Sequence, residues 1–162
     1  MAMFFLLITL VAVLIHLVLM KNRSPKKIVE VILLYLIVIN IGFGNILAGA
    51  AHIFNGPEVA KMIGWGAGSP FQYEVGVADI AMGSLGIMCI FFRGQFWLAA
   101  ILVNAVFLLG CMAGHVKDFI LGGNSAAYNI GPSIIVSDLI MPLVLICLYV
   151  LLQRMEKGAA SS

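Results

Sequence analysis

Five separate runs of about 20 apolar residues constrain this chain more than any other feature of its sequence. They occupy residues 2–20, 28–54, 73–92, 96–116 and 133–152. A helix of about 20 apolar residues is long enough to cross the hydrocarbon core of a bilayer. The 162-residue chain is 63% hydrophobic and 10% charged, and a soluble fold of this length cannot bury so much apolar surface. We therefore predict a single all-α membrane domain over the whole chain, built as a bundle of five transmembrane helices.

The positive charges indicate how this bundle is oriented. Four lysines or arginines lie in loop 21–27, Arg93 lies in the next short turn on that side, and Arg154 and Lys157 lie in the tail. The other side of the five spans has only Lys61 and Lys117. The positive-inside rule then predicts an outside N-terminus and a cytoplasmic C-terminus. Nine positive charges against seven negative ones are too evenly balanced to indicate a nucleic-acid partner.

Ionisable side chains concentrate toward the predicted outer ends of four spans. These residues are His52, Glu74, Asp79, His115, Asp118 and Asp138. A charged side chain inside a membrane span is costly, so each is a hypothesis about function by default. Their positions predict one polar layer in the outer half of the bundle.

Depth and helical spacing select the residues expected to meet in this layer. Four antiparallel helices with polar groups at one height must turn those groups toward each other or toward lipid, and exposure to lipid costs about 2.5–3.5 kcal/mol at the bilayer centre. We predict that the groups converge on one site, and that three further residues support it by hydrogen bonding. The predicted site residues are His52, Glu74, His115 and Asp138, and the supporting residues are Asp79, Asp118 and Asn45.

Helix geometry adds two local expectations. Glu74 points about 140° away from Asp79 on a regular helix, so both can face one site only if the helix start is distorted. Pro142 removes the hydrogen bond to the carbonyl of residue 138, which predicts a kink at Asp138.

The segment before the third span also carries recognisable signals. Ser69 and Gln72 have the spacing of a capping box, with serine at the N-cap and glutamine at N3. Trp65 is typical of an aromatic anchor at the membrane interface. The glycines at 76, 83 and 86 share a helix face with Asp79, and small residues let a neighbouring helix approach closely.

The polar layer has three interpretations. It is an internal hydrogen-bond and ion-pair network that fixes helix packing, or a metal site for zinc, iron or manganese. The third is a pocket for a lipid-like or quinone-like molecule, in which histidine–carboxylate pairs move protons. No Glu-x-x-His pair is present, so spacing alone leaves all three open.

Short motifs in spans two and three suggest a relationship to a known group. Residues 49–54 read GAAHIF, with Pro57 and a Gly-Trp turn after them, and residues 71–78 read FQYEVGVA. Together they resemble the DoxX-like superfamily of small bacterial membrane proteins, in its uncharacterised branches, over roughly residues 30–150. The resemblance implies a four-helix core in which His52 and Glu74 occupy characteristic positions. The chain departs from that pattern by adding the span at 2–20 and the acids Asp79 and Asp138.

The resemblance also bears on function. Some DoxX-like proteins are linked to thiosulfate:quinone oxidoreduction or to membrane oxidoreductase complexes. We expect a multi-pass protein of the bacterial inner membrane that serves as an accessory subunit or as a small-molecule-binding component. The alternative is a metal-dependent or quinone-linked oxidoreductase, or a subunit of one, that acts at the outer face with a membrane or soluble oxidoreductase as partner.

Overall fold

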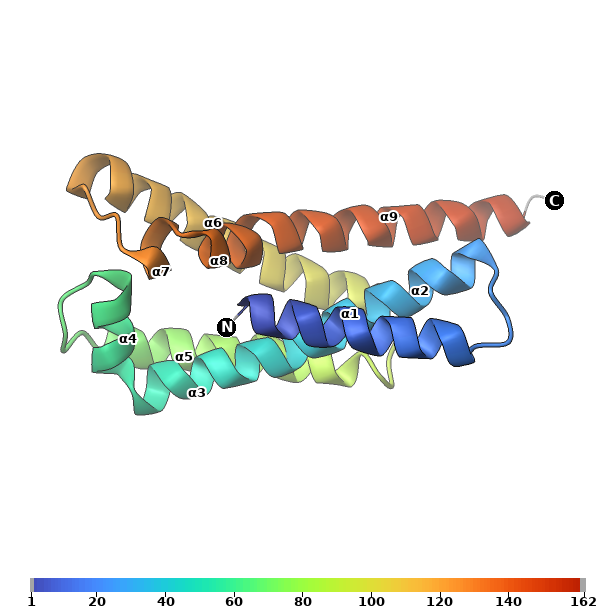
Figure 1. Cartoon of the computed structure of the whole chain (residues 1–162), viewed down its shortest axis with the longest axis horizontal. Coiled ribbons are helices and arrows are strands. Elements are labelled where there is room, and N and C mark those ends of the chain that lie inside the picture. The colour runs from blue at the N-terminus through green and yellow to red at the C-terminus, as the bar shows by residue number, and fades with distance from the viewer. Residues whose placement is uncertain (1, 161–162) are drawn as a thin grey trace.

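The structure is a computed structural model that describes residues 2–160, and Figure 1 shows an elongated bundle of helices. The elements are α1 (Ala2–Leu19), α2 (Pro25–Tyr35), η1 (Leu36–Gly44), α3 (Asn45–Phe54), α4 (Gly56–Ile63), α5 (Phe71–Met88), α6 (Gln95–Gly122), α7 (Ala127–Ile130), α8 (Pro132–Ile134), η2 (Ile135–Ile140) and α9 (Met141–Ala160). The segments η1 and η2 are π-helical. The described residues contain no strand, in agreement with the predicted all-α class.

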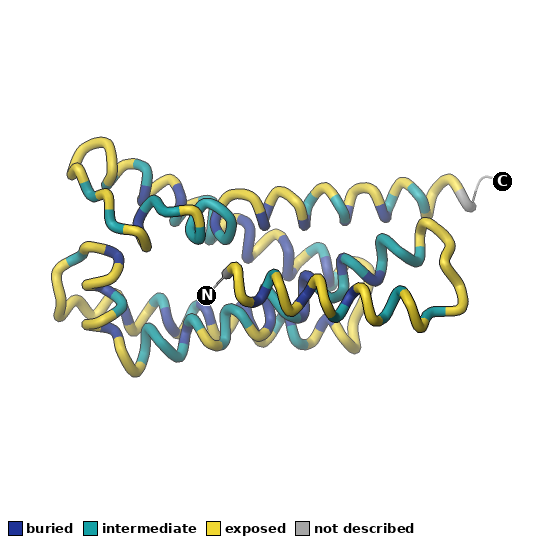
Figure 2. The backbone as a smooth tube through the Cα atoms, viewed as in Figure 1, coloured by how far each residue is buried: buried dark blue, intermediate teal, exposed yellow. Residues whose placement is uncertain are grey.

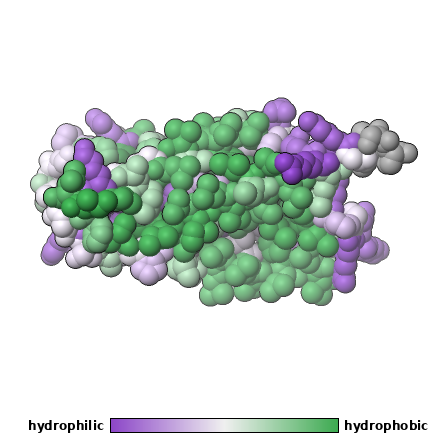
Figure 3. All heavy atoms as spheres, turned by 90° about the horizontal axis from the view of Figure 1, so that it is seen from above, coloured by the Kyte–Doolittle hydropathy of each residue, from purple (hydrophilic) through white to green (hydrophobic). Residues whose placement is uncertain are grey.

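Three helical stretches are long and apolar enough to cross a membrane: Pro25–Phe54, Gln95–Gly122 and Ala127–Gly158. The shorter apolar helix Met3–Leu19 packs beside them. Helix α5 is less apolar because its first half contains glutamine, glutamate and aspartate. Figure 3 shows apolar residues over most of the middle of one face, with polar residues toward the two ends. This surface supports a helical membrane protein, since soluble monomers rarely expose large continuous apolar patches.

The two ends of the bundle differ in composition. We call one the basic end; it includes loop 20–24, the turn at 89–94 and the end of α9. The other is the cap end, where α4 and α7 lie across the helix ends (Figure 1). Helix α1 runs only along the half of the bundle nearer the basic end (Figure 1). The cap-end half therefore has one long helix fewer around it.

The half nearer the basic end contains the apolar core. Figure 2 shows buried residues on the sides of the helices that face the bundle interior. Leu33, Ile101 and Leu145 of three different helices pack there around Trp97, which is 2% exposed. The Trp97 indole Nε1 donates a hydrogen bond to the Cys89 carbonyl over 2.9 Å. This half is thus packed by large side chains, with their polar atoms satisfied.

The basic end is closed by ion pairs centred on Glu30. Its carboxylate accepts hydrogen bonds from Lys27 Nζ over 2.9 Å and from Arg93 Nη1. Lys26 Nζ lies 3.3 Å from a carboxylate oxygen of Glu156. The charges predicted to share one side of the membrane therefore lie at one end of the bundle.

Helix α5 approaches both α3 and η1 through glycines, as the spacing predicts. A Cβ atom added to Gly49 would lie 2.6 Å from the Gly76 carbonyl oxygen, and one added to Gly86 would lie 2.5 Å from the Gly42 nitrogen. No side chain fits at such distances, so the two backbones touch directly.

The distortion expected near Asp138 is confirmed. The last long helix is π-helical over Ile135–Ile140, a segment that includes Asp138, and it returns to α-helix at Met141. Pro142 supplies no N–H for the carbonyl of residue 138, and a local π adjustment is one way a membrane helix reorganises its hydrogen bonds around proline.

Candidate functional site

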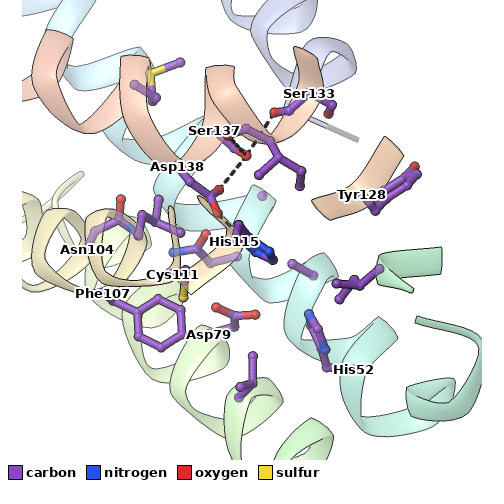
Figure 4. A pocket seen from close by; sticks show the side chains of 18 of the residues that line it. His52, Asp79, Asn104, Phe107, Cys111, His115, Tyr128, Ser133, Ser137 and Asp138 are labelled. Carbon is purple, nitrogen blue, oxygen red and sulfur yellow. Dashed lines mark hydrogen bonds and ion pairs between the residues drawn. The ribbon is translucent and has the colours of Figure 1, made fainter. Parts of the chain in front are cut away.

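The cap-end half of the bundle encloses a cavity of about 880 Å³. This volume lies within the 300–1,000 Å³ typical of small-molecule sites. Most of its lining side chains are apolar, and α3, α5, α6 and η2 all contribute to its walls. Figure 4 shows polar side chains from several helices directed into the same space. The polar lining residues are Asn40, Asn45, His52, Asp79, Asn104, His115, Tyr128, Ser133, Ser137 and Asp138.

His115 of α6 is held in one orientation by Asn129 of α7. Asn129 Nδ2 donates hydrogen bonds to the carbonyl oxygens of Asn124, over 2.8 Å, and His115, over 3.3 Å. Those two bonds fix the amide so that its Oδ1 lies 2.7 Å from His115 Nδ1. The ring must therefore carry its proton on Nδ1, because an oxygen cannot donate. In the neutral imidazole Nε2 is then left as a proton acceptor.

The Nε2 atom of His115 faces Asp138, as Figure 4 shows. It lies 3.9 Å from Asp138 Oδ2, and both side chains are buried. The other carboxylate oxygen of Asp138 accepts a 2.6 Å hydrogen bond from Ser137 Oγ. The pair is thus a proton acceptor and a carboxylate at the cavity wall, close enough to attract each other when the histidine is protonated.

Trp65 forms the cap-end wall beside His115. Gly64 adopts a left-handed φ of 85° and ends α4, which directs the following tryptophan back toward α6. The Trp65 ring stacks on His115 with 5.7 Å between ring centroids. Its Nε1 donates a 3.0 Å hydrogen bond to Asp118 Oδ2, which also accepts one from Asn124 Nδ2 over 2.7 Å. Asp118 therefore supports His115 through Trp65 rather than by the direct bond that we predicted.

His52 of α3 is bound by Gln72 of α5. The Nδ1 atom of His52 lies 2.7 Å from Gln72 Oε1, and the Gln72 side chain is buried. The predicted capping box is therefore wrong. The N-cap is Pro70, without a side-chain cap bond; Ser69 Oγ accepts a hydrogen bond from the Phe71 backbone N–H over 3.2 Å instead, and the glutamine turns inward. Its position, four residues before Gly76, places it on the buried face of α5.

Glu74 does not join the site. Its side chain is exposed, and it is absent from the cavity wall. Helix α5 is regular from Phe71 onward, so the distortion needed to turn both Glu74 and Asp79 inward does not occur. Asp79 takes its place: this side chain, predicted as a supporting residue, itself lines the cavity together with His52, His115 and Asp138.

Several polar groups at the cavity lack partners. The amide Nδ2 atoms of Asn45 and Asn104 are buried without a hydrogen bond, and Asn104 is only 1% exposed. Asp79 is 5% exposed, and none of the described residues donates a hydrogen bond to its carboxylate. An unpaired buried donor or acceptor costs about 1–3 kcal/mol. Two such amides around one cavity, with the Asp79 carboxyl beside them lacking a donor, need an explanation.

The described residues do not fit the predicted zinc, iron or manganese centre. No group of three or more His, Cys, Asp or Glu side chains among them is arranged to hold a metal ion. One physical reason is visible in the site: the Glu74 side chain is exposed and outside the cavity wall, so one of the four predicted ligands is missing.

Three residues that contribute to the site are not expected there from the sequence. Trp65 was assigned to the membrane interface and Gln72 to a helix cap, although the shared face of Gln72, Gly76 and Asp79 was a usable signal. Asn129 gave no signal, because it lies in the four-residue helix α7 after an irregular loop, where no periodicity can be read.

Comparison with known proteins places the chain in a family. The model of a family of unknown function, DUF6790, matches residues 1–158, so the chain belongs to that family. No curated protein and no solved structure matches it.

Proposed function

We propose that this member of the DUF6790 family binds an amphiphilic small molecule in its cap-end cavity. The observation that carries the proposal is a cavity of about 880 Å³ with mostly apolar walls and three polar groups, Asp79, Asn45 and Asn104, that lack hydrogen bonds. Ligand sites are typically apolar with a few placed polar groups that fix the ligand's orientation. An apolar chain would lie against the walls, and a polar head would bind the unpaired groups.

The alternative of a purely structural polar network explains only part of the layer. His52, His115 and Asp118 each have a hydrogen-bonding partner in the protein. Asp79 and Asn104 have none among the described residues. Buried polar groups that serve packing normally bond to each other, so these two favour a ligand.

The proposal includes a membrane arrangement with five spans. Helices α1 and α5 would cross together with the three longer stretches, and the cap end would face outside. The grouping of Lys26, Lys27 and Arg93 at the opposite end supports a cytoplasmic basic end under the positive-inside rule. The DoxX-like resemblance supports a four-helix core with α1 added, in the bacterial inner membrane. The cavity would then lie in the outer half of the bilayer.

Filling the cavity tests the proposal. A Cβ atom added to Gly114 meets no atom within 4 Å, and Gly114 lines the cavity. Gly114→Leu should therefore place a side chain in that space without disturbing the helix contacts. Ala113→Leu is the matched control, because Ala113 is exposed and outside the cavity wall.

The probes are decanol and decylubiquinone, titrated into protein in phosphatidylcholine nanodiscs with empty discs as blank. We expect saturable binding of at least one probe, weakened about tenfold or more by Gly114→Leu and unchanged by Ala113→Leu. Equal effects of the two variants, or no saturable binding, would contradict the proposal.

A quinone-linked activity is the second candidate, favoured by the pair His115–Asp138. A quinol must lose protons when it is oxidised, and His115 Nε2 is an acceptor that faces the cavity 3.9 Å from Asp138 Oδ2. In this version the protein would be a subunit of an oxidoreductase and would require a redox partner. Decylubiquinone binding that is lost in His115→Gln, with decanol binding retained, would support this candidate; equal loss of both would oppose it.

A further inference from the structure

The charge of the cavity wall narrows the class of ligand. Asp79 and Asp138 are among the lining residues, all of which the structure describes, and these residues include no lysine or arginine. The two carboxylates come from different helices, α5 and η2, and Figure 4 shows both directed into the same space. The wall therefore offers two carboxyl groups, and no lysine or arginine, to whatever enters.

The two carboxylates differ in what already neutralises them. Asp138 has the Ser137 hydroxyl at 2.6 Å and the His115 ring at 3.9 Å. Asp79 has no hydrogen-bond donor, and no histidine, lysine or arginine nitrogen of the described chain lies within ion-pair distance of it. An unpaired carboxylate is strongly disfavoured in an apolar interior unless a cation or a donor accompanies it. In membrane proteins, such acids commonly serve as counter-ions of a bound ligand.

The neighbouring side chains suit a positively charged head group. Trp65, Phe71, Phe107 and Tyr128 line the same cavity, and aromatic rings attract cations through their faces. The Asn104 amide, 1% exposed and without a partner, lines the cavity as well. It supplies a donor for an oxygen atom of the ligand. Apolar residues make up the rest of the wall.

We propose that the ligand is a lipophilic amine, with its ammonium group paired to Asp79 and its hydrocarbon part against the apolar wall. This inference rests on the proposed function and adds the ligand's charge. The ammonium group would supply the donor and the positive charge that Asp79 lacks in the protein itself. A neutral alcohol of the same chain length could donate a hydrogen bond but no counter-charge, and an anionic amphiphile would be repelled by the carboxylate.

Three probes with one chain length test the charge: decylammonium, decanol and decanoate. Each is titrated calorimetrically into the full-length protein in phosphatidylcholine nanodiscs, with empty nanodiscs subtracted to remove partitioning into lipid. We expect decylammonium to bind at least about tenfold more tightly than decanol, and decanoate to bind least. Decanol or decanoate binding as tightly as decylammonium would overturn this inference while leaving the cavity proposal intact. Saturable binding of no probe, decylubiquinone included, would overturn both.

Two variants assign the effect to one residue. Asp79→Asn keeps the size of the side chain and removes its charge, so it should weaken decylammonium binding about tenfold or more and change decanol binding much less. Glu74→Gln is the matched control, because it makes a similar change on the same helix at an exposed position outside the wall. An equal response of the two variants would contradict the assignment. Should Asp79→Asn fail to fold, the ranking of the three probes on the unmodified protein still decides the question.

Discussion

The two halves of this bundle share the same helices but use them differently. Toward the basic end, α6 packs Trp97 and Ile101 into a core with almost no exposure. Toward the cap end, the same helix presents Gly110 and Gly114 to open space, and a cavity of about 880 Å³ replaces the core. A membrane bundle can thus combine a tightly packed half, which holds the helices together, with a hollow half whose cavity has room for a ligand. We therefore expect matched substitutions in the two halves to change the stability of the protein by different amounts.

The largest expected difference is between two aromatic truncations on α6. Trp97→Ala should lower the free energy of unfolding by about 3–5 kcal/mol, because it removes a fully packed ring and leaves a void. Phe107→Ala removes a ring that lines an existing cavity, so we expect a much smaller loss. Thermal unfolding of both variants in one detergent measures the difference. Similar losses would show that the cap-end half is as tightly packed as the other.

A second comparison uses glycines from the two halves. Gly86→Ala places a Cβ atom 2.5 Å from the Gly42 nitrogen, and such overpacking typically costs about 1–3 kcal/mol. Gly114→Ala meets no neighbouring atom and should stabilise its helix by about 0.5–1 kcal/mol. The melting temperatures of the two variants should therefore move in opposite directions. A shift of the same sign in both would contradict direct backbone contact between η1 and α5.

The smallest effect on global stability is expected from Asn129→Ala in the cap. The change removes the acceptor of His115 Nδ1 and both amide donations, and an unpaired buried partner costs about 1–3 kcal/mol. The loss should be local, so hydrogen exchange should accelerate in α7 while the core around Trp97 stays protected. Asn55→Ala, at an exposed position without a side-chain cap bond, is the control and should leave exchange unchanged.

The overall plan could be read from the sequence because it depends on length and apolar composition. Runs of about 20 apolar residues predict helices, and the structure contains them. His52, His115 and Asp138 were assigned to one site by depth along antiparallel helices, a property that counting residues supplies. All three line one cavity.

The errors arose where local geometry decides the outcome. Glu74 lies at the right depth but on the wrong face, because α5 begins as a regular helix at Phe71. The hydrogen bonds that the two histidines donate to the amide oxygens of Gln72 and Asn129 depend on how α5 and α7 meet their neighbours. Spacing along one helix carries no information about such contacts. The cavity itself was also beyond spacing arguments, since side chains from several helices together form its walls.

The π-helical segments have a consequence for how this architecture can change. The segment η1 (Leu36–Gly44) contributes to both the apolar core and the cavity wall, and η2 (Ile135–Ile140) lies in the cavity wall directly before the core residue Met141. A π turn accommodates about one residue more than an α turn, so removing one residue there would rotate the two parts of the helix by about 100° relative to each other. A single-residue deletion in η2 would therefore turn the cavity-lining residues before it relative to the core residues of α9, whereas one in η1 would also displace residues of the core.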